Sequence, residues 1–521
     1  MTPEAATLAH PHTPAASQGK MPVREEVVMD GNRVRLLIED WLPIKEISIE
    51  SLRERTPMTP FPAPNRLHVW WARRPLVASR AAVLAGVLAS VIRSSADPTI
   101  QERIKQIFKH ILGIHGNPID AKKRIAEATR QGIRLGKDAY GYGRAFQYTP
   151  TSEELDWIRK HADLAGYGTK IVVADLMSGG GSIPFEILRL GMDAVANDLN
   201  PVAWLVLKAT IELPGKHGLP LLKRYRELGH DFVRRLRSKL SPFYPPEPEP
   251  NCIPDGYLWA RTIRCPYCGG IVPLLPNWKL DSKGKGVRLV PHIDSTEHRY
   301  CTFEIMEKVK DQRPGTIKGG DATCPFADCG RFIDGDEIKA QARAGRMGHQ
   351  LFAIGFKRQT VTGYTKAGKP KIKSVRDFRS PSCEDEIEMR VREELDAKLT
   401  EWQAADIIPQ EARYLGPADR CANYGITKHI DLFSPRQLLC HCTSVEVFRD
   451  LMDELSEPFQ EITELDRAAM IYLAIAIDKV ANYNSISTIW DATRVSIRQT
   501  FSRHDFSFKK PRQNNLSNFG D

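Results

Sequence analysis

Apolar residues recur along the chain with two different periods, and the change of period marks a strand–loop–helix unit. An apolar run at 171–174 ends in Asp175, and a glycine-rich loop follows it. Apolar positions over 183–190 then recur at the three- to four-residue spacing of a helix. A second short strand, 194–197, runs into Asp198. This order of strand, glycine loop, helix, strand and acid predicts a nucleotide-cofactor half-domain.

Local signals mark the ends of the predicted helices. Ser182 is positioned to cap the helix after the glycine loop, with Pro184 in its first turn and Gly191 at its end. Asn200-Pro201 opens another helix, since a capping side chain is followed by a proline at the first helical position. The predicted helix of the unit therefore lies between Ser182 and Gly191.

Patterning outside this unit divides the chain into modules. Residues before it are typical of helices, and the proline-rich stretch PFYPPEPEP after it indicates a stiff linker. The predicted organisation is a disordered tail (1–30), a helical N-terminal domain (31–165), the cofactor half-domain (166–241), the linker (242–251), a cysteine-rich module (252–350), a basic loop (351–382) and a mostly helical C-terminal region (383–521).

Composition is that of a globular protein with several domains. The chain has 521 residues, of which 42% are hydrophobic and 26% charged, with a net charge of +10. This charge permits nucleic acid as a partner without demanding it. The apolar segments 81–92 and 468–477 are too short to span a bilayer, and the first residues lack the apolar core of a signal peptide. We therefore expect no membrane partner and a cytoplasmic location.

The glycine loop carries the candidate cofactor chemistry. Glycines let a backbone approach a ligand closely, and an acid at the end of the second strand can accept hydrogen bonds from ribose hydroxyls. Pro184 occupies the place of the third glycine of a dinucleotide fingerprint, and no phosphate-binding NTPase loop is present in the sequence. Acids before and after the loop suit S-adenosylmethionine; the alternative is an ordinary glycine turn in an α/β core. The candidate cofactor residues are Asp175, Met177, Ser178, Gly179, Gly180, Gly181 and Asp198.

Two cysteine knuckles predict a structural zinc site. Cys265 and Cys268 are two residues apart, and Cys324 and Cys329 are separated by four, each pair being followed by glycine. Four thiolates give the closed tetrahedral shell of structural zinc, whereas disulfides are rare in cytosolic proteins. Possible substitutes in this ligand set are Cys252, His292 and Cys301, and the default for the remaining thiols is a buried free cysteine: Cys383, Cys421, Cys440 and Cys442.

Three basic or aromatic segments each leave two interpretations open. In HVWWARRP, Trp70 and Trp71 are either core residues or neighbours of a cleft in which Arg73 and Arg74 bind a carboxylate or phosphate. A basic helix over 222–240 is either a solvated face or a DNA contact. The lysine-rich segment 356–380 is either a mobile loop or a segment that follows a phosphate backbone.

Several motifs together resemble one family of large adenine-specific DNA methyltransferases. These enzymes have an inserted zinc ribbon and an N-terminal domain of unknown function, and are often found among phage-defence genes. The resemblance implies an α/β chain with a partial Rossmann-like S-adenosylmethionine-dependent methyltransferase domain, a helical N-terminal region and a mostly helical C-terminal region. It also implies DNA as the partner. The motifs are DLMSGGGSIPFEILRLG, NDLNPVA, HVWWARRPLVASRA, CPYCGG, CPFADC, QARAGRMGHQLFAI, DLFSPRQLL and DKVANYNS with WDATR.

The same resemblance assigns roles at the matching positions. It implies that Asp175 and Ser178–Gly181 form the cofactor loop, that Asp198 holds the ribose, and that the HVWWARRP segment supports the methionine end. One motif of this enzyme class, Asp/Asn/Ser-Pro-Pro followed by an aromatic residue, is absent, because the one Pro-Pro pair lies in the linker at Pro245-Pro246. The catalytic residues are therefore unassigned.

Three hypotheses follow from this departure. The chain is the N-terminal part of a methyltransferase whose catalytic half is missing or supplied by a second polypeptide. Alternatively, it is a zinc-containing DNA-binding or assembly subunit with a relic cofactor site. The third hypothesis is a methyltransferase that acts on another substrate.

Overall fold

The computed structural model contains two compact units, Met1–Glu212 and Leu213–Asp521. Their boundary divides the predicted half-domain 166–241, because the basic helix at its end belongs to the second unit. Residues 1–28 of the predicted tail, and Trp71, lie outside the described residues. The structure describes residues 29–30, 33–56, 61–70, 72–90, 97–136, 139–365, 368–414, 420–456, 461–500 and 512–514.

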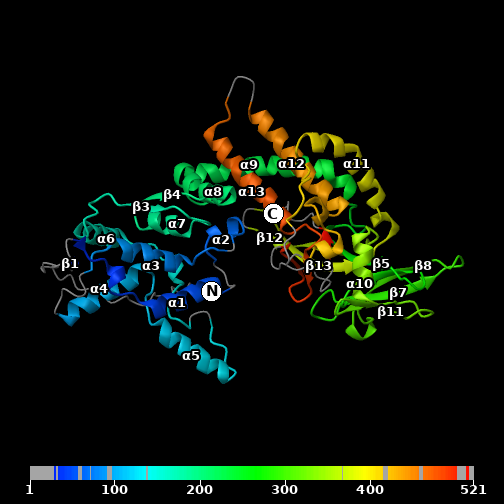
Figure 1. Cartoon of the computed structure of the whole chain (residues 1–521), viewed down its shortest axis with the longest axis horizontal. Helices are drawn as coiled ribbons and strands as arrows, with labels where there is room; N and C mark the ends of the chain where they lie inside the picture. Colours follow the sequence, from blue (N-terminus) through cyan, green and yellow to red (C-terminus); the bar gives the residue numbers. More distant parts are fainter. Residues whose placement is uncertain are drawn as a thin grey trace, which may run out of the picture. The chain divides into compact units, whose positions relative to one another are not determined.

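The first unit is mostly helical before residue 166, as the sequence predicts (Figure 1). Its apolar core extends from Leu37 to Met192 and includes the fully buried Phe108 and Ile187. The elements are β1 (Met29–Asp30), β2 (Arg33–Val34), η1 (Leu37–Glu39), α1 (Ile44–Arg55), α2 (Pro64–Leu67), α3 (Leu76–Val87), α4 (Pro98–Ile111), α5 (Pro118–Arg130), η2 (Ala145–Gln147), α6 (Ser152–Leu164), β3 (Val172–Asp175), α7 (Ser182–Arg189), β4 (Asp193–Ala196), α8 (Pro201–Leu207) and the π-helix η3 (Lys208–Glu212).

The predicted strand–loop–helix–strand unit is confirmed as β3, α7 and β4. The two strands pair in parallel from Val172 opposite Asp193 to Asp175 opposite Ala196. Among the described residues this sheet has two strands. One face packs against α7 through Val173. On the other face Val172 and Val195 are 56% and 52% exposed.

The predicted caps of this unit are confirmed at two positions and wrong at one. Asn200 caps α8 by accepting a hydrogen bond from the amide of Val202, and Gly191 ends α7 with φ 74°. Ser182 does not cap α7. The N-cap is Gly181, whose φ of 78° starts the helix without a side-chain acceptor.

A buried ion pair joins α7 to α3. Arg80 and Glu186 are both fully buried, and the Arg80 Nε donates to Glu186 Oε2 at 2.6 Å. The other Glu186 oxygen accepts a hydrogen bond from Arg189 at 2.7 Å, and Arg80 also donates to the carbonyl of Ile111. The Arg80 guanidinium therefore joins α3 to α7 and to the end of α4 inside the first unit.

The second unit combines antiparallel sheets with helices (Figure 1). Its largest sheet has the order β13-β12-β5-β16, with β6 also paired to β5. The remaining pairings are β7 with β8, β14 with β15, and a three-stranded sheet β11-β10-β9. The strands are β5 (Cys252–Arg264), β6 (Ile271–Leu274), β7 (Gly286–Ile293), β8 (Arg299–Met306), β9 (Ile317–Lys318), β10 (Asp321–Thr323), β11 (Phe332–Ile333), β12 (Gly348–Tyr364), β13 (Pro370–Arg379), β14 (Ile489–Asp491), β15 (Ser496–Arg498) and β16 (Arg512–Asn514).

The helices of this unit confirm a mostly helical region after residue 383. Three of them, α9, α12 and α13, pack together around one apolar core. The elements are α9 (Leu213–Leu240), η4 (Ser241–Phe243), η5 (Val309–Asp311), α10 (Gly335–Arg343), η6 (Cys383–Asp385), α11 (Glu388–Ala404), η7 (Ala422–Tyr424), η8 (Ile430–Leu432), α12 (Pro435–Leu455) and α13 (Glu464–Ala481). In the described parts of the chain, none of the helices combines the length and the apolar character that crossing a membrane requires.

The basic helix over 222–240 is the C-terminal part of α9, and three of its cations pair with acids of neighbouring helices. Arg224 pairs with Asp466 of α13, Arg235 with Glu454 of α12, and Lys239 with Glu446 at 3.0 Å. Neither a solvated face nor a DNA contact accounts for these three side chains. They join α9 to its helical neighbours.

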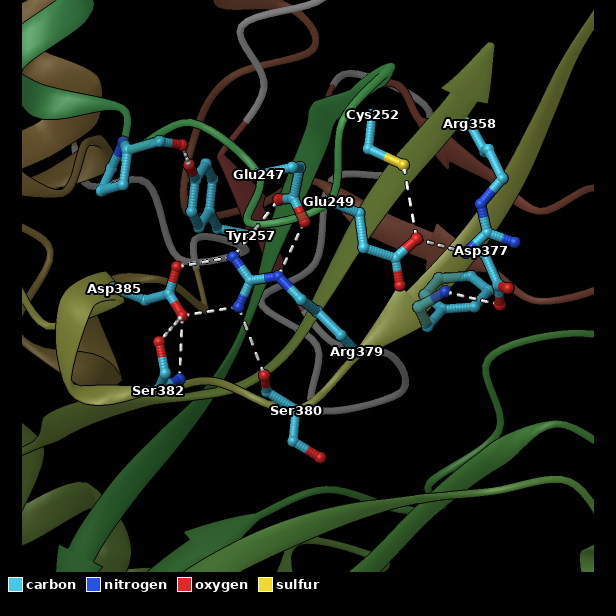
Figure 2. A network of polar contacts seen from close by, with 12 residues as sticks. Glu247, Glu249, Cys252, Tyr257, Arg358, Asp377, Arg379, Ser380, Ser382 and Asp385 are labelled. Atoms are coloured by element: carbon cyan, nitrogen blue, oxygen red, sulfur yellow. Dashed lines mark hydrogen bonds and ion pairs between the residues drawn. The ribbon is translucent and has the colours of Figure 1, made fainter. Parts of the chain in front are cut away.

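The predicted stiff linker 242–251 is wrong as a boundary, because its side chains are anchored in the second unit. Glu247 accepts from Arg379 Nε at 2.7 Å, and Arg379 also donates to both oxygens of Asp385 (Figure 2). Tyr257 donates its hydroxyl to the carbonyl of Pro245 at 3.4 Å. The prolines make this stretch extended, and tertiary ion pairs then hold it on the sheet.

The predicted basic loop 351–382 is instead a long hairpin of β12 and β13. The strands pair from Ile354 opposite Arg379 to Tyr364 opposite Pro370, with a bulge after Val361. The β-branched residues in QTVT and KIKSV explain this, since such residues favour strands whatever the charge of their neighbours. The core beneath the cysteine-rich module also reaches Phe378 and Trp490, so residues 252–350 do not form a closed module.

Candidate functional site

The structure brings the four predicted ligand cysteines together. Cys265 and Cys268 follow β5, and Cys324 and Cys329 lie between β10 and β11. Their sulfur atoms all lie within 4.8 Å of one another. The two closest approaches are Cys265 to Cys329 at 3.8 Å and Cys268 to Cys324 at 3.7 Å.

These distances fit a tetrahedral metal. A Zn–S bond of about 2.3 Å in a regular tetrahedron separates the sulfurs by about 3.8 Å. The two knuckles are alike, since the amide of Cys265 donates to Gly270 and that of Cys324 to Arg331. A glycine with positive φ follows each second cysteine, at Gly269 and Gly330. The arrangement is a closed four-thiolate shell, which serves structure and leaves no position for a substrate.

The substitute ligands lie elsewhere. Cys301 points its thiol at the carbonyl of Ile271, and burial raises the pKa of this thiol to about 12. His292 bonds to the hydroxyl of Thr302, and Cys252 lies beside Glu249. Of the predicted buried free thiols, Cys440 and Cys442 are buried, Cys421 is half-buried and Cys383 is exposed.

The glycine loop is a tight, hydrogen-bonded turn between β3 and α7. The Ser178 hydroxyl donates to the carbonyl of Asp175 at 2.7 Å, and the amide of Gly181 donates to the carbonyl of Ser178 at 2.9 Å. Gly179 and Gly181 have φ of 52° and 78°, the left-handed region that favours glycine. Met177 is 89% exposed at the rim of the loop.

Asp198 lies against this loop, as the sequence predicts. Its Oδ2 accepts from the amide of Gly179 at 2.7 Å, and its Oδ1 accepts from the amide of Asn200 at 2.9 Å. Each carboxylate oxygen can accept a second hydrogen bond. Asp198 thus fixes the loop and retains acceptor capacity for a hydroxyl group.

Trp70 and Arg73 cover the glycine loop, which sequence reasoning left open. A Cβ atom at Gly179 would lie 2.8 Å from Trp70 Nε1, and one at Gly180 would lie 3.1 Å from Arg73 Nε. The glycines therefore give these two side chains room to approach the backbone. Arg74, next along the chain, is exposed.

Two charged side chains beside the loop each bury an atom that has no hydrogen-bond partner among the described residues. These atoms are Arg73 Nη1 and Asp175 Oδ2. Burial lowers the pKa of Arg73 to about 10. A desolvated cation and a desolvated carboxylate oxygen next to one loop provide recognition for a ligand that carries both charges.

The basic hairpin divides into a paired base and an unpaired tip. At its base Lys357 and Arg376 bracket the buried carboxylate of Asp255. Lys371 and Lys373, two residues apart and so on one face of β13, are exposed, and within the described residues no carboxylate pairs with them. The tip is therefore the part of the hairpin with charge available for a partner.

Fold and centre together define a mixed α/β protein with a four-cysteine candidate metal centre. Residues 41–110, which span α1 to α4, match a family described as a protein of unknown function (DUF1156). No curated protein and no solved structure matches the chain.

Proposed function

We propose that this protein is the cofactor-binding part of an S-adenosylmethionine-dependent DNA adenine-N6 methyltransferase. The observation that carries the proposal is the polar surround of the glycine loop. Arg73 and Asp175 each present a buried atom without a partner among the described residues, and Asp198 follows β4. The β3–α7–β4 unit is then the first half of a Rossmann-like domain.

Three residues beside the glycine loop match the polar groups of the methyl donor in charge and hydrogen-bonding capacity. Arg73 suits the carboxylate of the methionine part, Asp175 suits its ammonium group, and Asp198 suits the ribose hydroxyls. S-adenosylmethionine supplies the methyl group when bound. Residues of this chain hold its two ends, and the acceptor is the exocyclic amino group of adenine in DNA.

The two-stranded sheet supports a source of further strands outside the described residues, either more of the same chain or a second polypeptide, for the catalytic half. Parallel sheets are found with both faces covered, whereas one face of the β3–β4 pair exposes Val172 and Val195. Further strands added to this pair would complete the domain. The motif that contacts the target adenine, absent from this sequence, would then come with those strands.

Two further assignments belong to the proposal. Zinc occupies the four-cysteine centre, since the sulfur separations match a Zn–S tetrahedron. The protein acts as part of a phage-defence or restriction-modification-like system. Its location is the cytoplasm, and the ten free cysteines of the structure support this part of the proposal, because disulfides are rare there.

Binding of two cofactor fragments tests the assignments residue by residue. Calorimetry with S-adenosylhomocysteine and with 5′-methylthioadenosine, which lacks the amino-acid end, should show binding of both to the wild type. Asp198→Ala should weaken both about 10-fold or more, because a hydrogen bond to a charged group contributes roughly 1.5–3 kcal/mol. Arg73→Ala should weaken only S-adenosylhomocysteine.

Matched controls exist for both variants. Asp193→Ala removes a carboxylate at the opposite end of β4, whose side chain is 63% exposed, and Arg74→Ala removes the exposed neighbour of Arg73. Neither should change affinity. Failure of the wild type to bind S-adenosylhomocysteine would contradict the proposal.

A second candidate function is a non-catalytic, zinc-containing DNA-binding subunit with a relic cofactor site. The absence of the Pro-Pro-aromatic motif from this sequence favours it. It predicts DNA binding without cofactor binding. Incubation with tritiated S-adenosylmethionine and unmethylated DNA, with and without a partner that carries the motif, separates the two: label in DNA only with the partner supports the split enzyme.

A further inference from the structure

An open cavity in the first unit lies apart from the glycine loop and the cysteine centre. Its volume is about 1010 Å³, and it lies between α1, α5 and the segments 134–136 and 139–147. Among the described residues that line it are four cations, Arg53, Lys122, Arg134 and Arg144, and no carboxylate. We call it the tyrosine–arginine cavity.

The rear wall of this cavity is a built arrangement. Glu50, 1% exposed, accepts from the Tyr142 hydroxyl at 2.8 Å and from Arg53 at 3.2 Å. Arg53 also donates to the carbonyls of Tyr142 and Gly143, at 2.7 Å and 3.1 Å. Its guanidinium lies 4.0 Å from the ring centre of Tyr140. Buried hydrogen bonds therefore hold two aromatic rings and a cation in fixed positions.

The front of the cavity is cationic. Within the described residues no carboxylate pairs with Lys122 or Arg134. The pKa of Arg144 is lowered by burial and then by the charge of Arg53. The buried carboxylate of Glu50, behind the wall, is already engaged by Arg53 and Tyr142. The cavity therefore favours an anion.

The walls also require that the anion has flat, apolar parts. Leu52 and Leu135 line the cavity and are 60% and 41% exposed. A small inorganic ion would make no favourable contact with these apolar side chains. Tyr140 is half-buried, with Arg53 stacked on its ring. The cations come from three separate segments, so they match several phosphates better than the single head group of a fatty acid.

We infer that this cavity binds nucleoside phosphates, with phosphates on the cations and bases against the tyrosine and leucine walls. The phosphates come either from a single nucleic-acid strand or from a free nucleotide. Its volume exceeds what one mononucleotide fills and suits a dinucleotide step. The inference stands whether or not the glycine loop binds a methyl donor.

Fluorescence anisotropy and calorimetry on the full chain test the site. The probes are a 12-nucleotide single strand, its duplex, the dinucleotide pTpT and the mononucleotide dTMP. The single strand should bind more tightly than the duplex. Dinucleotide affinity equal to that of the 12-mer identifies the free nucleotide as the source, and much weaker dinucleotide binding identifies the strand.

Variants at exposed positions tie the binding to the cavity. The double variant Lys122→Ala with Arg134→Ala should weaken single-strand binding about 10-fold or more and reduce the slope of log K against log salt by about 1.4, since each phosphate contact on a single strand contributes about 0.7. Tyr140→Leu should weaken binding with the salt slope unchanged. Lys123→Ala is the control, because Lys123 is 75% exposed and pairs with Asp120.

Two results would overturn the inference. One is the absence of binding by all four probes at millimolar concentration. The other is binding that survives both the double variant and Tyr140→Leu, which places the nucleic acid elsewhere on the chain. Neither result bears on the calorimetry of the glycine loop, so the two proposals fail independently.

Discussion

Arg379 and Arg358 show how burial decides the importance of an ion pair. Arg379 contacts Glu247 and Asp385, whose side chains are 2% and 1% exposed. Arg358 contacts Glu249, and both of those side chains are about half exposed. Figure 2 shows both arginines at the anchored linker, so they act on the same segment in different surroundings.

Removal of each arginine should therefore have unequal effects on stability. Arg379→Ala leaves two buried carboxylates unpaired, and we expect it to lower the free energy of unfolding by about 3–5 kcal/mol. Arg358→Ala breaks an exposed pair and should cost less than about 1 kcal/mol. Urea denaturation of both variants measures the difference. Equal losses would show that the linker is not held by Arg379.

The same cluster predicts a dependence of stability on pH. Burial acts to raise the pKa of Asp385, but hydrogen bonds from Arg379 and Ser382 outweigh it, so the pKa is lowered on folding. A lowered carboxyl pKa stabilises the fold above the unfolded value, near pH 4, and this contribution is lost as pH falls further. The stability difference between wild type and Asp385→Asn should be constant from pH 7 to 5 and shrink below pH 4. A difference that grows in acid would contradict this assignment.

At the scale of elements, the hairpin of β12 and β13 separates a structural base from a free tip. The base cations share the carboxylate of Asp255, while Lys371 and Lys373 have no carboxylate partner among the described residues. A two-stranded ribbon is narrow enough to enter the major groove of DNA. For the proposed DNA-binding function, we therefore expect the tip of this hairpin to contact the duplex.

Salt dependence of duplex binding tests this tip. The double variant Lys371→Ala with Lys373→Ala should reduce the slope of log K against log salt by about 1.8, because each phosphate contact on duplex DNA contributes about 0.9. Ile372→Thr, on the intervening residue, should leave the slope unchanged. A double variant with the wild-type slope would exclude the tip from DNA contact.

Local elements could be predicted from the sequence because their causes are local. The glycine loop, the Asn200 cap and both cysteine knuckles depend on residues within one turn of each other. The contact of Trp70 and Arg73 with the loop joins residues about 110 positions apart, and nothing near either segment encodes it. The hairpin could not be predicted for another reason, since its high charge is typical of a loop and outweighs the β-branched residues of QTVT and KIKSV.

At the scale of the whole molecule, each unit has its own apolar core. One core includes Ile187 and Phe108 of the first unit. The second unit has two apolar cores. The cysteine centre lies in the core that includes Trp278 and Trp490. The centre therefore acts on the stability of the second unit.

Metal removal should for this reason affect one of two unfolding transitions. Chelation by 1,10-phenanthroline, or Cys265→Ser, should release about one zinc per chain and lower the melting temperature of the second unit by several degrees, because metal-binding energy is folding energy. The transition of the first unit should not move. Calorimetry with metal analysis measures both, and freshly purified protein without zinc would exclude the centre as a zinc site.

The buried Arg80–Glu186 pair has a practical consequence for the boundaries of expressed fragments. The segment 41–110 that matches the DUF1156 family contains Arg80, but Glu186 lies 76 residues beyond its end. A fragment cut at 110 would bury a guanidinium without its carboxylate, and would also lose the Ile111 carbonyl that accepts from it. The shortest fragment that folds on its own should thus extend through α7. It is therefore longer than the segment 41–110 that matches the family.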